Sequence, residues 1–547
     1  MNIYFCGIGG VGLGALAELA HDAGHQVQGS DINESLMTKE LASRGIAINL
    51  KQKGAFLQAV HGMKPVDLFV YTAALSPDHP ELEMAKHLGI KTVKRDELLL
   101  DIIAEKKLKL IAISGTHGKT TTTGMLIWAF KKLGIPASYS IGTTIGFGPS
   151  GHYDPNSQYF IYECDEFDRN FLAFHPHLSL VTSIDYDHPD TYGTPEDYVA
   201  AFRQFLDQSQ STIMWKGDGV LIHATNEDGW ILEQDDVANV TLPGEYYRRD
   251  ATLAIKALEK LEIPGDHLAA LNSYPGSSRR FEQVTHNLYS DYGHHPTEIA
   301  ATLQMARELN DNVVLVYQPH QNTRQHEVRS LYVDCFEQAD EVYWLPTYLT
   351  REDPTLSILT PEQLTEDIAN RDHVHIVGSK DDLWGMIQQA RAKGKLVLIM
   401  GAGSIDSWLR DKIETPQSVN ILLIDGQGNF VMKRGVATRD NHVETVSGSV
   451  SPDDISLLAA AVRTLQQTTN LVFRAEDLVY FRTFPRTAEM SGEKSLITYF
   501  TMTGVNPQSL ELADGFVPAV VSPNELSQYA FSILDRSVIA EFTHPAG

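Results

Sequence analysis

At the centre of the chain the sequence reads Leu110-Ile111-Ala112-Ile113-Ser114-Gly115-Thr116-His117-Gly118-Lys119-Thr120-Thr121. This run predicts a strand, a glycine turn and a helix in succession. Its first five residues are an apolar run that predicts a buried strand, and a helix is expected over Lys119–Lys132. A glycine turn between a strand and a helix presents backbone N–H groups that bind anions. Lys119 is placed to reach the β- and γ-phosphates of a nucleotide, and Thr120 or Thr121 to bind Mg²⁺. The stretch therefore predicts a phosphate-binding loop, shorter than the common Gly-x4-Gly-Lys-Thr form.

Another glycine turn, the first in chain order, stands near the start of the chain. Gly7-Ile8-Gly9-Gly10-Val11-Gly12 follows the apolar run Asn2–Cys6 and precedes the helical stretch Gly14–Ala23. Asp31 lies about twenty residues further on, as in the turns that bind pyrophosphate-bearing nucleotides. This spacing fits a dinucleotide cofactor as well as a nucleotide-sugar, and a turn used only for packing is the simpler alternative.

Strand-like and helix-like runs alternate through most of the chain, which predicts βαβ units around parallel sheets. The expected fold class is therefore α/β, and 547 residues suggest three or four domains at roughly 150 residues each. Glu414–Ser418 is expected to be a linker before a unit of different texture. The predicted domains are a Rossmann-like domain (1–105), a P-loop ATPase-like domain (106–272), a second Rossmann-like domain (273–413) and an α+β domain (419–547).

Composition excludes several classes of function. A net charge of −26 disfavours a nucleic-acid or membrane-surface binder, because phosphate groups select clustered Lys and Arg. Three cysteines are too few for a disulfide framework, which suits a reducing cytosol. The N-terminus shows no targeting segment, and no apolar run reaches the length of about 18 residues typical of a membrane helix. We expect a cytoplasmic protein without membrane insertion, and the sequence carries no signal for an oligomeric state.

Several segments together resemble the Mur ligase family. Gly115–Thr121 resembles its phosphate loop, and Ile184–Asp190 resembles the stretch that carries its metal-binding histidine. The remaining similar segments are the acidic run Glu163-Cys164-Asp165-Glu166-Phe167-Asp168 and the C-terminal motifs Asp291–Glu298, Tyr317–His320 and Met400–Ile405. The likeness covers residues 1 to about 412 in three collinear blocks.

The resemblance implies a UDP-sugar-binding N-terminal domain, a central ATPase domain and a mobile C-terminal domain. The lactoyl carboxylate of UDP-N-acetylmuramate would attack the γ-phosphate of ATP, and the amine of an amino acid would displace phosphate from the resulting acyl phosphate. Within the family, Gly7–Gly12 with Gly29-Ser30-Asp31 most resembles the members that add L-alanine. The expected role is an ATP-dependent ligase of peptidoglycan precursor synthesis.

The resemblance also implies the residues of the site. Both chemical steps gather negative charge, so Lys119 and Mg²⁺ are the expected stabilisers. Without the family, Glu163 and His188 would be interpreted as a surface acid and a buried structural histidine, and histidine is a less usual Mg²⁺ ligand than a carboxylate. The implied groups are Gly115, Thr116, His117, Gly118, Lys119, Thr120 and Thr121 for ATP; Gly7, Gly9, Gly10, Gly12, Ser30 and Asp31 for the UDP-sugar; Thr120, Glu163 and His188 for the metal; and Lys119, His294, His295 and Arg324 for catalysis.

Four features depart from the family pattern: Ser290 stands where an aspartate is common, the central domain is shorter than usual, and two binding segments are altered. Gly244–Ala251 stands where Gly-x-His-Asn-x-x-Asn-Ala contacts adenine, and it contains Tyr246, Tyr247 and Asp250. One of the tyrosine rings is expected to stack on the base instead. Gln321 replaces an arginine that binds the amino acid carboxylate, a loss worth about 1.5–3 kcal/mol of binding or a sign of another amino acid.

Residues from about 419 onward lie outside the usual Mur ligase chain. Gly448-Ser449-Val450 and Arg463–Leu471 resemble a Nudix box. Thr464, Gln467 and Thr468 stand where that box carries its metal-binding glutamates, and neutral side chains do not supply the negative charge that Mg²⁺ requires. We expect a Nudix-like fold without hydrolase activity.

Three other functions compete with the single-amino-acid ligase. One is the relative that attaches a preformed tripeptide to the same UDP-sugar, which Asn322-Thr323 after His320 resembles; Gly9-Gly10 and the Gln-Pro-His run favour the single-amino-acid enzyme. Another is a non-catalytic regulatory protein that binds a nucleotide and a UDP-sugar. An NAD-dependent oxidoreductase is the weakest of the three, because it leaves the second phosphate loop unused.

Overall fold

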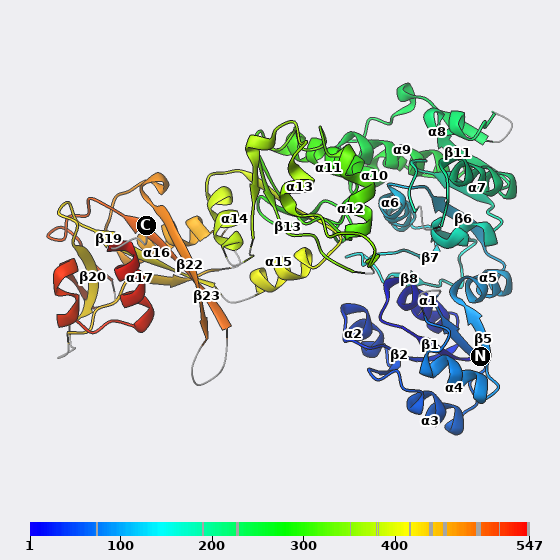
Figure 1. Ribbon diagram of the computed structural model, residues 1–547, viewed down its shortest axis with the longest axis horizontal. Helices are drawn as coiled ribbons and strands as arrows, with labels where there is room; N and C mark the ends of the chain where they lie inside the picture. Colours follow the sequence, from blue (N-terminus) through cyan, green and yellow to red (C-terminus); the bar gives the residue numbers. More distant parts are fainter. Residues whose placement is uncertain are drawn as a thin grey trace. The chain divides into compact units, whose positions relative to one another are not determined.

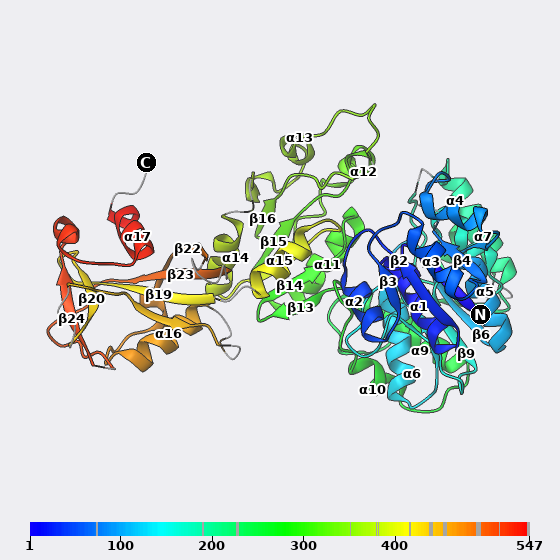
Figure 2. The same cartoon turned by 90° about the horizontal axis from the view of Figure 1, so that it is seen from below.

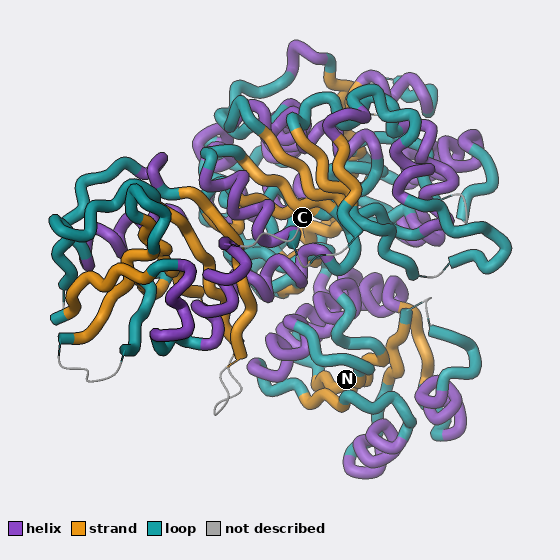
Figure 3. The backbone as a smooth tube through the Cα atoms, turned by 60° about the vertical axis from the view of Figure 1, so that its left-hand side comes forward, coloured by secondary structure: helices purple, strands orange, loops and turns teal. Residues whose placement is uncertain are grey.

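The computed structural model describes residues 1–547 except 73–74, 189–190, 226–228, 351, 379, 381, 415–416, 437–440, 452–453, 455–456, 488–493, 514 and 544–547. The chain divides into two compact units, Met1–Glu282 and Gln283–Gly547. The described residues form four β-sheets, each with helices packed around its strands (Figures 1 and 3).

The N-terminal sheet is parallel, with the strand order β3-β2-β1-β4-β5. All five residues of its central strand β1 are buried, as expected for a strand covered by helices on both faces. The first glycine turn joins β1 to α1. The strands are β1 (Asn2–Cys6), β2 (Gln26–Ser30), β3 (Ala47–Asn49), β4 (Leu68–Tyr71) and β5 (Lys91–Lys94), and the helices are α1 (Val11–Asp22), α2 (Leu36–Ser43), α3 (Ala55–Met63), α4 (Pro80–His87) and α5 (Arg95–Lys106).

The central sheet has the order β12-β11-β10-β6-β9-β7-β8, and of its described pairs only β7–β8 is antiparallel. Successive residues of β6 alternate between two cores: Ile111 and Ile113 pack with α6 and α9, while Leu110 and Ala112 face the core that contains α7. The strands are β6 (Lys109–Ser114), β7 (Ser138–Ser140), β8 (Gly151–His152), β9 (Tyr159–Glu163), β10 (Leu178–Val181), β11 (Thr212–Trp215) and β12 (Gly229–Leu232), and the helices are α6 (Lys119–Lys132), α7 (Pro195–Gln208), α8 (Lys216–Leu221), α9 (Glu245–Lys260) and α10 (His267–Asn272).

The third sheet has the order β13-β14-β18-β15-β16-β17, and its pairs from β14 to β17 are parallel. The central strands β15 and β18 are buried throughout. The strands are β13 (Glu282–Thr285), β14 (Leu288–Asp291), β15 (Val313–Tyr317), β16 (Glu341–Trp344), β17 (Val374–Ile376) and β18 (Leu396–Met400), and the helices are α11 (Pro296–Leu309), α12 (Asn322–Val328), α13 (Pro361–Thr365), α14 (Leu383–Ala392) and α15 (Ile405–Glu414).

The fourth sheet is mixed, with the order β22-β23-β19-β20-β24 and β21 paired to β19. β19 runs parallel to β23 and antiparallel to β20 and β21. The two helices cover opposite faces, because α16 packs in one core and α17 in another (Figure 2). The elements are β19 (Gln417–Ile424), β20 (Phe430–Gly435), β21 (Val446–Ser449), α16 (Leu457–Thr468), β22 (Val479–Thr487), β23 (Lys494–Met502), β24 (Phe516–Val521) and α17 (Ile533–Thr543).

The predicted α/β fold class is confirmed, and some boundaries differ. α1 begins at Val11 instead of Gly14, because the glycine turn ends with a residue that already has helical geometry. The predicted linker Glu414–Ser418 is shorter than expected, since α15 ends at Glu414 and β19 begins at Gln417; residues 415 and 416 lie outside the described part. Among the helices that the structure describes, none combines the length and the apolar character that a bilayer crossing requires.

Candidate active site

The second glycine turn lies at the carboxyl ends of adjacent parallel strands. The sheet order places β6 between β10 and β9, so the residues that follow these strands meet at one edge. Gly118 caps α6 with φ of 83°, in the left-handed region that favours glycine. A Cβ on Gly118 would lie 2.7 Å from Oδ1 of Asp250, so a larger residue would collide with α9. The turn therefore has the geometry of an anion cradle at a helix N-terminus.

Lys119, the central residue of the phosphate loop, is paired within the protein. Its Nζ lies 2.8 Å from Oε2 of Glu166 and donates to the carbonyl oxygen of Thr116 at 3.1 Å. Glu166 is fully buried. Burial opposes the charge on both groups, but each stabilises the other, so the pKa of Lys119 is raised and the pKa of Glu166 is lowered. The ammonium is therefore charged, and Glu166 and the Thr116 carbonyl hold it within the phosphate loop.

Two of the three predicted metal-binding residues are brought together. The hydroxyl of Thr120 donates to Oε1 of Glu163 at 2.6 Å, and Oε2 of Glu163 accepts from the backbone N–H of Gly142 at 2.7 Å. Nε2 of His188 instead lies 3.6 Å from Oε1 of Glu166. A hydroxyl and a carboxylate are hard oxygen donors, which fit Mg²⁺.

The rest of the phosphate loop is anchored to the segment that follows β10. The backbone N–H of His117 donates to Oγ of Ser183 at 2.9 Å, and Nε2 of His117 lies 3.2 Å from Oδ2 of Asp185. The hydroxyl of Thr116 donates to the carbonyl oxygen of Asp185 at 2.7 Å. Thr121 is buried within the first turn of α6. Thr116 and His117 therefore fix the shape of the loop through their side chains.

The altered adenine segment forms the start of α9. The hydroxyl of Tyr247 donates to the carbonyl oxygen of Arg280 at 2.6 Å, which fixes that ring against the protein. Tyr246 is 45% exposed, so its ring is the one available to stack on a base. Asp250 is buried behind the phosphate loop, and burial raises its pKa to about 8.

The first glycine turn is organised by Asp31. The backbone N–H of Gly9 donates to Oδ2 of Asp31 at 2.8 Å. Gly10 caps α1 without a side-chain hydrogen bond to the helix, so the helix start stays open to an anion. Ser30 is fully buried, and its hydroxyl donates to the buried carboxylate of Glu81. The side chain of Ser30 therefore supports the turn from beneath.

The predicted residues of the third domain form a separate cluster. His294 is half-buried close to Arg324, and its backbone N–H donates to Oε2 of Glu298 at 2.9 Å. Burial, reinforced by the charge of Arg324, lowers the pKa of His294 to about 4, so the ring is neutral at pH 7. His295 caps α11 and accepts through Nδ1 from the backbone N–H of Thr297.

Sequence reasoning missed two residues of these clusters, Glu166 and Tyr348. Glu166 lies in the acidic segment, but nothing in its spacing indicates a pairing with Lys119. The ring of Tyr348 stacks on His320 with centroids 5.8 Å apart, and its carbonyl oxygen accepts from the backbone N–H of Gln321 at 2.9 Å. Gln321, where the family carries arginine, has φ of 59° and caps α12. No sequence signal predicted these contacts, because their residues lie far apart in the chain: 47 positions for Lys119 and Glu166, and 28 for His320 and Tyr348.

Comparison with known families accounts for three of the four sheets. Residues 2–107 match the Mur ligase family catalytic domain, residues 113–229 the Mur ligase middle domain, and residues 279–403 the Mur ligase glutamate ligase domain. A curated relative, the UDP-N-acetylmuramate–L-alanine ligase of Campylobacter jejuni, is 32% identical over 450 residues, covering 76% of this chain and 99% of its own. The enzyme of that name from Rhizobium meliloti is 30% identical, covering 74% and 95%. The chain belongs to the Mur ligase family.

Solved structures agree on the fold. The UDP-N-acetylmuramate–alanine ligase of Thermotoga maritima has a TM-score of 0.61 at 24% identity, over 76% of this chain and 98% of its own. A murein peptide ligase from Psychrobacter arcticus has a TM-score of 0.53 at 22% identity, over 75% and 98%. Within its family, the chain is thus similar in sequence to enzymes that ligate L-alanine to UDP-N-acetylmuramate.

Proposed function

We propose that the chain is an ATP-dependent ligase that joins L-alanine to the lactoyl carboxylate of UDP-N-acetylmuramate. The observation that carries the proposal is the cradle at the start of α6, where Lys119, Thr120 and Glu163 meet at one sheet edge. This cradle has the groups that phosphoryl transfer needs: an anion-binding helix start, a charged lysine and oxygen donors for a metal. The names of the relatives supply the substrates.

Lys119 is proposed to shift its ammonium from Glu166 to the transferred phosphoryl group. A carboxylate oxygen of the acid forms a bond to the γ-phosphorus while the bond to the ADP oxygen breaks, which gives an acyl phosphate. Thr120 and Glu163 would hold Mg²⁺, which supplies charge neutralisation at the phosphates when bound. His188 beside Glu166 is placed to complete or orient this donor set.

The amine of the amino acid then attacks the carbonyl carbon of the acyl phosphate, loses a proton, and phosphate leaves. Arg324 is the proposed partner of the amino acid carboxylate. A pKa of about 4 makes His294 a weak proton acceptor, so its proposed role is to orient the amine through the neutral ring. His295 is proposed to hold the start of α11 in place beside it.

The first glycine turn is proposed to hold the UDP-sugar. Gly7, Gly9, Gly10 and Gly12 place the open start of α1 against the diphosphate, while Ser30 and Asp31 shape the turn. The cytoplasm is the proposed compartment, since ATP is the phosphoryl donor. The domain limits 1–105, 106–272, 273–413 and 419–547 remain our proposed division.

The fourth domain is proposed to be Nudix-like and inactive as a hydrolase. Its mixed sheet between two helices supports that fold. Arg463 donates through Nε and Nη2 to the carboxylate of Asp454 at 2.9 and 2.7 Å, which ties Asp454 to α16. Thr464 is buried, and the hydroxyl of Thr468 donates to the carbonyl oxygen of Thr464 at 2.6 Å. The side chains of Thr464 and Thr468 are neutral, so they offer no carboxylate to a metal.

The proposal is tested by ADP release from ATP, Mg²⁺ and UDP-N-acetylmuramate over a panel of amino acids and a preformed peptidoglycan tripeptide. We expect turnover with L-alanine and a loss of at least about 100-fold in Lys119→Ala, because one preorganised charge is worth about 3 kcal/mol at the transition state. Turnover with the tripeptide alone would make the protein a recycling ligase. Binding of both nucleotides without ADP from any amine would make it a regulatory protein.

A further inference from the structure

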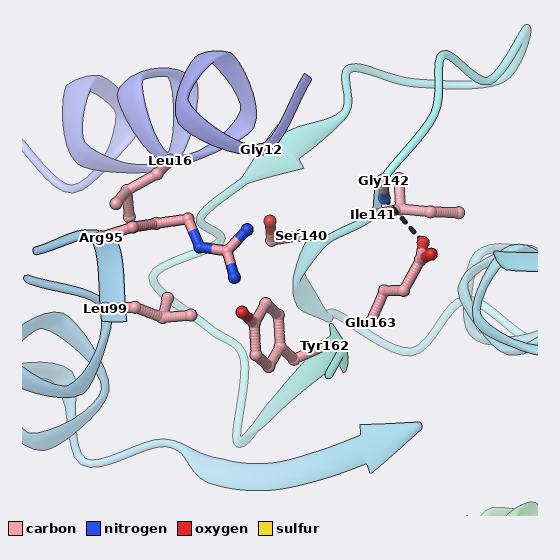
Figure 4. Close-up of a pocket in the computed structure, with 9 residues that line it drawn as sticks. All are labelled: Gly12, Leu16, Arg95, Leu99, Ser140, Ile141, Gly142, Tyr162 and Glu163. Atoms are coloured by element: carbon pink, nitrogen blue, oxygen red, sulfur yellow. Dashed lines mark hydrogen bonds between the residues drawn. The ribbon is translucent and has the colours of Figure 1, made fainter. Parts of the chain in front are cut away.

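A small cavity lies between the two glycine turns of the first unit. It encloses about 40 Å³ and is lined by residues of four elements, α1, α5, β7 and β9, and of the segment after β7 (Figure 4). Gly12, the last glycine of the first turn, forms one wall. Glu163, which bonds to Thr120 of the phosphate loop, forms another. The cavity therefore borders both the predicted UDP-sugar turn and the predicted metal site.

Arg95, the first residue of α5, lines this cavity with its positively charged guanidinium. Its Nε donates to Oδ1 of Asp96 at 3.1 Å, and its two terminal nitrogens make no hydrogen bond with any residue that the structure describes. A Cβ on Gly12 would lie 2.8 Å from Nη1 of Arg95, so the glycine lets the guanidinium approach the start of α1. Figure 4 shows the guanidinium directed between Ser140 and Tyr162.

Two hydroxyl groups of largely buried residues line the cavity beside the guanidinium. Ser140 is 8% exposed and Tyr162 is 5% exposed, and within the described part of the chain neither hydroxyl has a hydrogen-bond partner. The terminal nitrogens of Arg95 and these two hydroxyls line one cavity without a protein acceptor, so they are free to donate to an acceptor that enters it. Glu163 does not fill this role, because its two oxygens are engaged by Thr120 and Gly142.

We propose that Arg95, with the hydroxyls of Ser140 and Tyr162, binds an oxyanion of the UDP-linked acid. The inference rests on the proposed function, in which this acid spans from the first glycine turn to the phosphoryl donor. A guanidinium fork matches carboxylate and phosphate oxygens in geometry and in charge. The acid carries both chemistries, a diphosphate at the turn and a carboxylate at the reacting end.

Calorimetry on the full-length protein separates the two sources. Arg95→Met and wild type are titrated with UDP-N-acetylmuramate, which has the carboxylate, and with UDP-N-acetylglucosamine, which has the diphosphate alone. We expect Arg95→Met to weaken UDP-N-acetylmuramate about 10- to 100-fold, the range of lost charge-assisted hydrogen bonds. An equal loss for both sugars assigns Arg95 to the diphosphate, and a selective loss assigns it to the carboxylate.

Two further variants and one further ligand keep the test decisive. Arg95→Lys, which retains the charge without the fork, is expected to bind with intermediate affinity, and Tyr162→Phe to lose about 3- to 10-fold. A non-hydrolysable ATP analogue should bind the Arg95 and Tyr162 variants as tightly as wild type, which shows that they are folded. Unchanged affinity for both sugars in Arg95→Met and Tyr162→Phe overturns the inference. Failure of wild type to bind either sugar would instead overturn the proposed function.

Discussion

Single residues of the site hold one another in the states that the chemistry requires. Lys119 stays charged because Glu166 faces it, and Thr120 meets Glu163 through a hydrogen bond. Asp250 lies against Gly118 of the phosphate loop. None of the salt bridges described in the structure includes Asp250, and burial is the main influence on its pKa. Its burial raises the pKa to about 8, so the carboxyl is protonated at pH 7 and takes the place of the amide that the family carries.

Asp250→Asn should change how stability depends on pH. The folded pKa of about 8 lies above the ordinary value of 3.8, so between these limits the folded state binds more protons than the unfolded state. Stability of the wild type therefore falls as pH rises towards 8, by at most about 1.4 kcal/mol per pH unit from this group. Urea unfolding at pH 6, 7 and 8 measures the free energy of unfolding of both proteins. The value for Asp250→Asn should rise relative to that of wild type at each step in pH. The exposed substitution Asp311→Asn is the control, and a pH-independent difference for Asp250→Asn would refute the assignment.

At the scale of elements, regular strands and helices could be predicted and contacts between them could not. The limits of β1 and α6 agree with the residues predicted for them, Asn2–Cys6 and Lys119–Lys132. The phosphate loop followed from a strand, two glycines and a lysine, because its function depends on local backbone. The pairing of Lys119 with Glu166 is a tertiary contact between the segments that follow β6 and β9. Local sequence patterns do not predict such contacts.

The same limit applies to the side chains that the resemblance transferred. Thr120 and Glu163 lie together, whereas His188 lies beside Glu166. Ser30 was predicted to contact the UDP-sugar, but its side chain is buried against Glu81. Arg95 opens α5 at a charged position with no motif around it, and only the close approach to Gly12 distinguishes it from a surface residue.

The turn that begins α6 should tolerate no side chain at Gly118. Gly118→Ala combines a left-handed backbone, costing about 1–2 kcal/mol, with a Cβ 2.7 Å from Asp250. Gly134→Ala is the matched control, because Gly134 has φ of 70° and no atom within 4 Å of the added Cβ. Urea unfolding and ATP-analogue binding should show Gly118→Ala as the less stable variant and the only one with reduced affinity. Equal effects of the two substitutions would mean that the contact with Asp250 is unimportant.

At the scale of the whole molecule, the three matched Mur ligase regions are followed by a mixed sheet, our proposed fourth domain, that these regions do not include. The family matches end at residue 403, and the mixed sheet begins at Gln417. The fourth domain carries its own two cores, one on each face of its sheet. The mixed sheet is therefore covered on both faces by its own helices, and Leu496 of β23 also packs in the core of the third sheet.

The fourth domain should not hydrolyse nucleoside diphosphate compounds. Full-length protein incubated with UDP-N-acetylmuramate and Mg²⁺, without ATP or amino acid, should release no UMP, because Thr464, Gln467 and Thr468 offer no carboxylate. Chromatography of the nucleotide products checks this. A steady release of UMP would show that a metal site exists elsewhere in the domain.

Reaction through an acyl phosphate requires that one oxygen atom of the acid leaves with the phosphate. UDP-N-acetylmuramate labelled with ¹⁸O in the lactoyl carboxylate is incubated with ATP, Mg²⁺ and L-alanine, and the released phosphate is analysed by mass spectrometry. Because the carboxylate attacks phosphorus and the amine later displaces that oxygen with the phosphate, each phosphate should carry one ¹⁸O, and Lys119→Ala should release almost none. Phosphate free of label, formed at the rate of ligation, would contradict the account.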